Sequence, residues 1–216
     1  EVDPAVIASR LPPGLHPDLF DGRAYLGLVP FFMRRVRPRH LPAVPGLSNF
    51  YEMNVRTYVH DREGIPGVWF FSLDASNAIA CAVARARFHL SYFDAAIRAT
   101  KQDWIRFHAI RRGQDTAAEF RYRGHGPPRE AAPGTLDFFL VERYALYAHH
   151  PGKGRLYRGT VHHSPYSLHE AEAPRWSTLP VAWDDLPEPS GPPVHSCYAE
   201  TIDVEVFGLE PVTNGS

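Results

Sequence analysis

Apolar and polar residues alternate along much of this chain, which is the pattern of β-strands that bury one face. Within residues 104–112, for example, Phe107 and Ala109 alternate with Arg106 and His108. Similar segments are rich in aromatic or β-branched residues and are bounded by Gly, Pro, Asp or Asn. We therefore predict strands in residues 23–37, 52–60, 67–73, 104–112, 118–124, 155–163 and 201–207.

Helical patterns are fewer. The predicted helices are residues 3–12, 76–87 and 134–144. Asp74 or Ser76 would cap the second helix, Thr135 would cap the third, and Pro12 would end the first. Many strands with a few short helices predict a β-rich α+β fold, a barrel or sandwich decorated by helices.

The prolines concentrate in three segments that we predict to be loops. These are residues 37–46, 124–134 and 186–194. None of them is long enough to separate two domains, and 216 residues is an ordinary length for one β-rich domain. We expect a single domain over residues 1–216, with residues 176–193 as a surface excursion.

Charge and composition exclude several classes of protein. Hydrophobic residues make up 44% of the chain, as in globular proteins, and the net charge is -1. A near-neutral chain lacks the basic surface that binds nucleic acid or an anionic membrane. No apolar stretch is long enough for a membrane span and no signal peptide is visible, so we expect a cytoplasmic bacterial protein. A targeting segment ahead of Glu1 and a homo-oligomeric state stay open.

Motifs for metals and common cofactors are missing from the sequence. It has no HExxH, HxH, P-loop, GxGxxG or GxSxG motif, so we expect neither a metal nor a cofactor. Adjacent histidines on a strand point to opposite faces, so His149 and His150 cannot together hold one ion. The turn at residues 151–154 predicts a hairpin that brings His149 near the next strand. Cys81 and Cys197 lie far apart, and we interpret them as buried free thiols, with a disulfide as the less favoured alternative.

The strand predicted over residues 52–60 carries the main candidate site. Because side chains alternate, Glu52, Asn54 and Arg56 share one face of this strand. A carboxylate, an amide and a guanidinium can together orient a polar ligand or tune an acid near neutral pH. The same face could instead be solvated, as the polar faces of antiparallel strands commonly are. Trp69 is most economically a core aromatic, and it is kept as a further candidate for ligand contact.

Long stretches of the chain resemble a known family. The resembling segments are residues 11–46, 50–59, 66–85, 89–97, 134–147 and 154–168. They are similar to the YqjF-like proteins, a conserved bacterial family of unknown function (DUF2071), from about residue 4 to residue 207. That family looks like a branch of the acetoacetate decarboxylase-like superfamily. The resemblance implies a β-barrel with a buried central pocket.

Residues 72–93 carry the relation to the decarboxylases. There the family stretch contains an arginine, to which Arg85 is similar, and ends in two lysines, the first of which forms a Schiff base with a keto acid. With Arg85 on that arginine, Tyr92 and Phe93 fall on the two lysines, and Arg85 becomes a candidate ligand-binding residue. A phenol cannot form an imine, because a Schiff base requires a primary amine. The resemblance therefore implies that imine chemistry is excluded at position 92.

The remaining lysines do not replace the missing amine. Lys101 and Lys153 are the only lysines of the chain, and their polar and Gly-rich surroundings predict exposed side chains. The resemblance also implies that Glu52 matches the pocket carboxylate of the superfamily.

Three functional hypotheses follow. The first is a barrel that binds an organic acid or a carbonyl compound through Asn54, Arg56 and Tyr92. The second is an enzyme without an imine, a lyase, hydratase or isomerase, with Glu52 as general acid or base, Tyr92 as proton donor and Arg56 as anchor. The third is a structural or interaction protein with a vestigial pocket. The sequence leaves open whether the protein is an enzyme.

Overall fold

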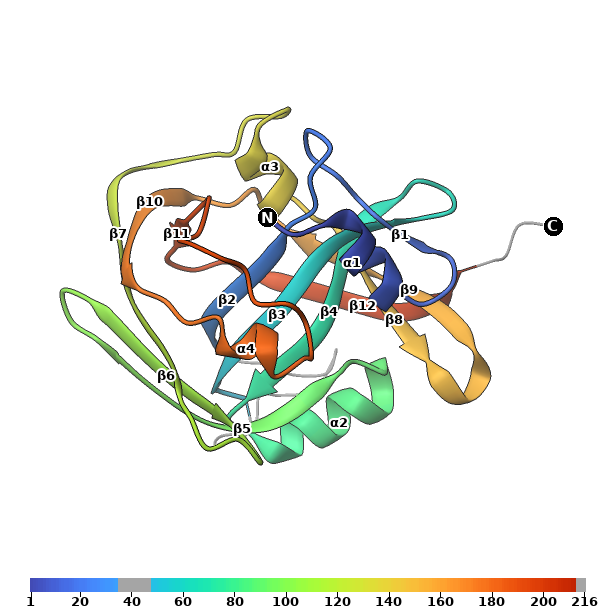
Figure 1. Cartoon of the computed structure of the whole chain (residues 1–216), viewed down its shortest axis with the longest axis horizontal. Coiled ribbons are helices and arrows are strands. Elements are labelled where there is room, and N and C mark those ends of the chain that lie inside the picture. Colours follow the sequence, from blue (N-terminus) through green and yellow to red (C-terminus); the bar gives the residue numbers. More distant parts are fainter. Residues whose placement is uncertain (35–47, 213–216) are drawn as a thin grey trace.

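A computed structural model gives the structure of the chain and describes residues 1–34 and 48–212. The described residues form twelve strands and four short α-helices (Figure 1), which confirms the predicted β-rich α+β class. The strands are β1 (Leu15–Pro17), β2 (Leu26–Met33), β3 (Phe50–Asp61), β4 (Pro66–Ala75), β5 (Tyr92–Lys101), β6 (Ile105–Arg111), β7 (Ala118–Arg129), β8 (Ala145–His150), β9 (Arg155–His163), β10 (Leu168–Arg175), β11 (Cys197–Ala199) and β12 (Val204–Pro211). The helices are α1 (Pro4–Arg10), α2 (Ala78–Phe88), α3 (Leu136–Val141) and α4 (Leu179–Ala182), with a 3₁₀ turn, η1 (Pro151–Lys153).

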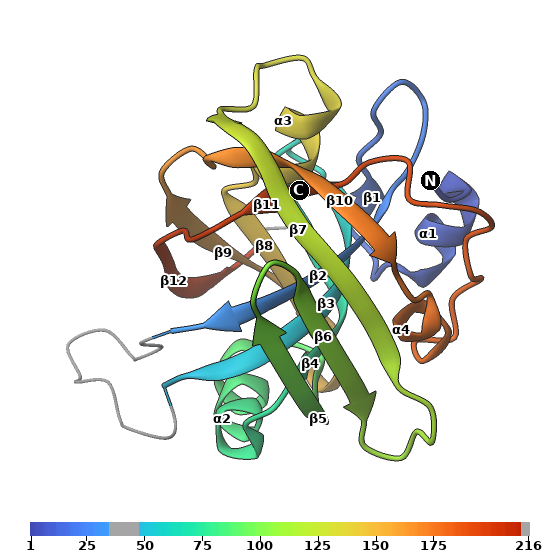
Figure 2. The same ribbon diagram turned by 90° about the vertical axis from the view of Figure 1, so that its left-hand side faces the viewer.

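Strand β4 is the branch point of the sheet. One edge of β4 pairs with antiparallel β3, which also pairs with β1 and β2. The other edge is shared by two parallel partners, β8 beside its first half and β5 beside its last residues. From there one arm runs β5-β6-β7-β10-β11 and the other runs β8-β9-β12. In Figure 2 the first arm lies across β2 and β3, so β3 has neighbours on both of its faces.

The helix ends follow from their capping residues. Asp3 accepts a hydrogen bond from the backbone of the first turn of α1, and Thr135 caps α3 as predicted. The cap of α2 is Asn77, whose side chain accepts from two backbone N–H groups, so the prediction of Asp74 or Ser76 is wrong. The Ser76 hydroxyl instead accepts a hydrogen bond from the backbone N–H of Tyr51 on β3.

Most of the predicted strands are present, with shifted ends. The alternation in residues 104–112 is confirmed, since Phe107 and Ala109 are buried whereas Arg106 and His108 are exposed. The predictions missed β1, β5, β8, β10 and β11. Residues 35–37 of the first predicted strand lie outside the described residues, as does the proline-rich segment 37–46. Strand β5 lacks a long apolar run, because small and charged residues occupy much of it. This segment forms a strand because it pairs with β4 and β6, whereas its own sequence pattern does not predict a strand.

The segment of residues 176–193 is not the surface excursion that we expected. It contains α4, and Val181 and Leu186 are buried against Val55 of β3. Asp184 of this segment accepts a hydrogen bond from the Arg111 guanidinium at 2.7 Å. The segment is thereby tied to the sheet by both apolar packing and a buried ion pair.

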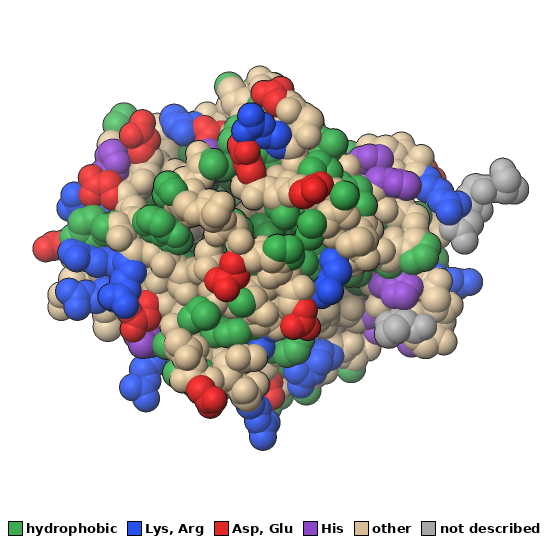
Figure 3. All heavy atoms as spheres, in the orientation of Figure 1, with side chains coloured by type: hydrophobic (Ala, Val, Ile, Leu, Met, Phe, Trp, Pro, Cys, Tyr) green, Lys and Arg blue, Asp and Glu red, His purple; other side chains and the backbone are tan. Residues whose placement is uncertain are grey.

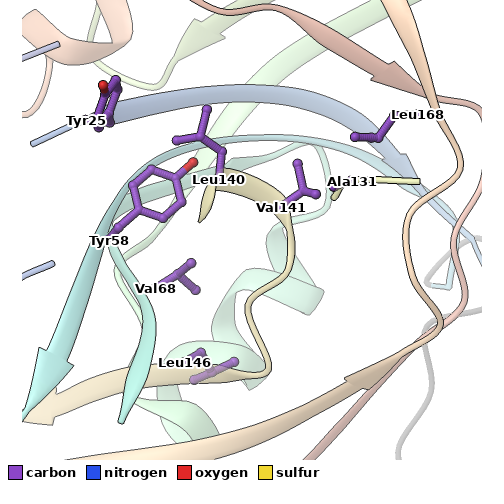
Figure 4. Packing of buried hydrophobic residues seen from close by; sticks show 8 residues of the cluster. All are labelled: Tyr25, Tyr58, Val68, Ala131, Leu140, Val141, Leu146 and Leu168. Atoms are coloured by element: carbon purple, nitrogen blue, oxygen red, sulfur yellow. The ribbon is translucent and has the colours of Figure 1, made fainter. Parts of the chain in front are cut away.

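The apolar core is divided between the two faces of β3. On one face Met53 packs with Ile97, Phe107 and Phe120 of the β5-β6-β7 arm. On the other face Tyr58 packs with Tyr25, which lies just before β2, and with residues of β4, α3, β8 and β10 (Figure 4). Burial on both faces leaves no solvated side for the polar residues of this strand.

The remaining expectations concern cysteines, the hairpin and membrane spans. Cys81 is buried, Cys197 is partly buried, and both are free thiols. The predicted hairpin is confirmed as β8–β9, in which His149 pairs with Leu156. None of the described helices combines the length and the apolar character of a membrane span.

On the face seen in Figure 3, Lys and Arg side chains gather near the turn between β5 and β6, and acidic side chains are scattered.

Candidate functional site

Glu52, Asn54, Arg56 and Tyr58 of β3 form one face of the strand, which we call the Glu52 face. Their positions alternate with those of Met53 and Val55, which pack on the other side. Glu52 is 2% exposed and Asn54 is 4% exposed, so the solvated alternative for this face is wrong. The polar residues instead lie under α2, α3 and the neighbouring strands.

The Tyr92 side chain contacts Glu52 by passing over the small side chain of Ala75. Glu52 pairs with Ala75 of β4, and Tyr92 pairs with Leu73 two residues earlier on the far side of β4. Since alanine has only a methyl group, the phenol can pass over it, and the Tyr92 hydroxyl donates to Glu52 Oε2 at 3.1 Å. Two residues that the sequence places 40 positions apart are thus in direct contact.

Burial controls the protonation of this pair. Burial raises the pKa of Glu52 to about 8, the Tyr92 hydrogen bond acts in the opposite direction, and the nearby charge of Asp74 adds to the increase. Burial also raises the pKa of Tyr92 well above its usual range. At neutral pH Glu52 is therefore a neutral carboxyl group that can donate a proton, beside a neutral phenol.

Asn54 and Arg56 each carry a buried polar atom without a partner. Asn54 Oδ1 and Arg56 Nε are both enclosed and make no hydrogen bond. Arg56 Nη2 donates to the backbone oxygen of Leu140 on α3 at 3.0 Å. Among the described residues no carboxylate lies within 4.0 Å of the Arg56 guanidinium. An unmade hydrogen bond at a buried group costs about 1–3 kcal/mol, so two together on one strand face are unusual.

A glycine on the neighbouring strand leaves space for the Arg56 side chain. Gly27 of β2 pairs with Arg56, and a Cβ atom at this position would lie 3.3 Å from Arg56 Cγ and 3.2 Å from the Tyr58 hydroxyl oxygen. The Arg56 side chain keeps part of its surface accessible. The sequence analysis did not single out Gly27, and an isolated glycine in an otherwise apolar strand is the signal that could have identified it.

The other two candidate residues lie elsewhere. Trp69 pairs with Thr57 and packs with Leu15 and Val59, on the opposite side of the sheet from Glu52. Arg85 is on the exposed side of α2, where it donates to the backbone oxygen of Tyr92 at 3.0 Å. Arg85 therefore holds the start of β5 but does not reach the Glu52 face.

Cys81 is a neighbour that the sequence analysis did not connect with the site. It is fully buried in a cluster with Phe50 and Ala75, against which Tyr92 packs. Burial raises the pKa of the Cys81 thiol to about 12, with a contribution from Asp94. The thiol is therefore inert as a nucleophile at neutral pH and acts as packing for the pair.

Two surface hollows are lined by other residues. The first, of about 370 Å³, lies between the start of α2 and the β6–β7 turn. The second, of about 400 Å³, is lined by residues that include Leu136 and Asp137 of α3 and His195. Leu136 lines this hollow, and the backbone oxygen of Leu140, one turn later in α3, accepts the Arg56 hydrogen bond.

Amines and metal ligands are not gathered at this face. Both lysines are exposed as predicted, and Lys101 donates to the Tyr198 hydroxyl at 3.2 Å. Within residues 1–34 and 48–212, no three His, Cys, Asp or Glu side chains lie close enough together to hold a metal ion.

Comparisons with known proteins agree with this architecture. Acetoacetate decarboxylase from Legionella pneumophila subsp. pneumophila str. Philadelphia 1 matches with a TM-score of 0.59 and 12% identity, over 99% of this chain and 82% of that one. An acetoacetate decarboxylase-like enzyme from Sphingomonas wittichii RW1 matches with a TM-score of 0.60 and 15% identity, over 98% and 87%. At these identities the likeness concerns the fold, and it confirms the predicted acetoacetate decarboxylase-like β-barrel.

Sequence comparisons extend the agreement to the family. The uncharacterized protein YqjF of Bacillus subtilis (strain 168) is 38% identical over 174 residues, which cover 80% of this chain and 71% of YqjF. The family DUF2071, described as an uncharacterized conserved protein, matches residues 1–203. The chain therefore belongs to the DUF2071 family.

Proposed function

We propose that the Glu52 face binds a small organic acid or carbonyl compound. The observation that carries this proposal is the pair of enclosed, unpartnered polar atoms, Asn54 Oδ1 and Arg56 Nε. A ligand that bonds to both would remove the cost of leaving them unsatisfied, which makes binding favourable. The acid group would lie at Arg56, because a guanidinium without a carboxylate partner favours an anion.

Ligand retention and a pair of arginine variants test the proposal. Native mass spectrometry of the purified chain is expected to show a retained small molecule. Butyrate, titrated into the chain by calorimetry, is expected to bind at least about 10-fold more weakly to Arg56→Met, because a charge-assisted hydrogen bond is worth about 1.5–3 kcal/mol.

Arg85→Met is the matched control, since Arg85 is exposed and lies outside the Glu52 face. It is expected to bind butyrate as the wild type does. Equal weakening by both variants, or an unliganded mass together with no butyrate binding, would contradict the proposal.

An enzymatic function is a second candidate, favoured by the contact of Tyr92 with Glu52. A neutral carboxyl group whose pKa lies near 8 can give or take a proton at physiological pH. Glu52 would then act as general acid or base, Tyr92 as proton donor, and Arg56 as carboxylate anchor in a lyase, hydratase or isomerase reaction.

A panel of keto acids and enoyl acids tests this second candidate. Turnover is expected to depend on pH with an inflection near pH 8, and Glu52→Gln is expected to abolish it, because an amide cannot transfer the proton. Absence of turnover across the panel would count against the enzymatic function and leave the binding function in place.

A further inference from the structure

The unpartnered atom of Asn54 is an acceptor. The oxygen Oδ1 is enclosed in the protein, and no N–H or O–H group of the described residues donates to it. A ketone or a carboxylate oxygen cannot satisfy this atom, because both are acceptors as well. The ligand group that faces Asn54 must carry a hydrogen, as a hydroxyl or an N–H group does.

The unpartnered atom of Arg56 has the opposite requirement. Nε is a donor, and Nη2 of the same guanidinium is already engaged by the Leu140 carbonyl. The guanidinium carries a full positive charge and has no carboxylate within ion-pairing distance among the residues that the structure describes. A carboxylate of the ligand satisfies both the hydrogen bond and the charge.

The strand geometry limits the distance between these two ligand groups. Residues two apart on one strand face are separated by about 7 Å at Cα, and their side chains lie side by side. Gly27 of β2 pairs with Arg56, and its missing side chain leaves space that the Arg56 and Tyr58 side chains occupy. The donor and the carboxylate must therefore belong to one small molecule, a few bonds apart.

We infer that the ligand of the Glu52 face is a carboxylic acid that carries a hydrogen-bond donor on its carbon chain, a hydroxy acid in its simplest form. This inference rests on the proposed function and narrows it, because it selects hydroxy acids over keto acids and unsubstituted acids. The hydroxyl donates to Asn54 Oδ1, and the carboxylate accepts from Arg56.

Three acids of equal chain length test the inference. The purified chain is titrated at pH 7 with 2-hydroxybutyrate, 2-oxobutyrate and butyrate, and each Kd is measured by calorimetry or by NMR. The hydroxy acid is expected to bind roughly 5- to 150-fold more tightly than the other two, which is the cost of an unsatisfied buried acceptor expressed as a ratio. Equal or tighter binding of 2-oxobutyrate would overturn the inference.

A substitution assigns the selectivity to Asn54. In Asn54→Leu, a side chain of similar size without the oxygen, the ratio of the Kd of butyrate to that of 2-hydroxybutyrate is expected to fall to about 1. A retained preference would overturn the inference, and the comparison of acids in the wild type stands alone if this variant does not fold. Binding of all three acids with equal affinity would refute the inference and spare the proposed function. Binding of none of them would refute the inference, and together with an unliganded mass it would refute the proposed function as well.

Discussion

The buried carboxyl group of Glu52 makes a quantitative prediction for the pH dependence of stability. Its pKa is about 8 in the folded protein, whereas in the unfolded chain it has the ordinary value of about 4.3. Between these two values the folded protein binds one more proton at this position than the unfolded chain does. Stability therefore falls as the pH rises through this window, in contrast to the usual carboxylate with a lowered pKa.

The size of the effect follows from the same two values. Each pH unit within the window costs about 1.4 kcal/mol, so between pH 5 and pH 8 this group alone removes about 3 to 4 kcal/mol of stability. Glu52→Gln keeps the shape and an acceptor for the Tyr92 hydroxyl, but it cannot ionise. We expect the variant to match the wild type within about 1 kcal/mol at pH 5 and to exceed it by about 3 kcal/mol at pH 8.

Urea unfolding of both proteins at pH 5, 6, 7 and 8, followed by circular dichroism, measures this difference. The difference isolates Glu52, because every other titrating group is common to both chains. Glu205→Gln, on the exposed part of β12, is the matched control and is expected to give a curve parallel to that of the wild type. A difference between Glu52→Gln and the wild type that does not change with pH would show that Glu52 is ionised in the fold and would refute the reasoning.

Two further predictions concern the frame around the site. Arg111→Met is expected to destabilise the fold by about 3–5 kcal/mol in urea unfolding, since it leaves two buried carboxylates without their ion-pair partner. The Arg112 side chain is 84% exposed, so Arg112→Met is the control and is expected to change the stability little. Equal effects of the two substitutions would contradict a buried ion pair. Gly67→Ala is expected to cost about 1–3 kcal/mol, because its Cβ would lie 2.7 Å from the backbone oxygen of Ala145. Gly208→Ala, where a Cβ meets nothing within 4 Å, serves as its control in thermal unfolding, and similar melting temperatures of both variants would show that β4 and β8 can move apart.

The alternation of residues in β3 was sufficient to predict that Glu52, Asn54 and Arg56 share a face. The alternation could not predict whether this face is buried or solvated, because a period of two residues defines two faces without identifying the buried one. The contact of Tyr92 with Glu52 depends on the parallel pairing of β5 with β4. The local sequence pattern of residues 92–101 does not predict this strand. Tyr92 was named as a candidate only through the resemblance to the decarboxylases.

Trp69 shows why a pocket residue cannot be chosen by type alone. Near the site, β4 has an irregularity opposite Val55 and Arg56, where one extra residue changes the parity of the strand. Leu73 stays on the same side as Asn54, whereas Trp69 packs on the other side with Val59. A bulge of this kind follows from the pairing of two strands, so it is not visible in one segment of the sequence.

The Glu52 face combines a neutral acid with an unpaired cation, and the strand geometry explains why the two do not neutralise each other. Residues four apart on a strand are separated by about 13 Å at Cα, so Glu52 cannot act as the counterion of Arg56. With Glu52 protonated, the face has a positive charge from Arg56 and no negative charge of its own. A bound carboxylate would compensate Arg56, and its negative charge would further favour the protonated form of Glu52. Because linkage is reciprocal, the proton on Glu52 and a bound acid would then strengthen each other, so loss of that proton above pH 8 would weaken binding.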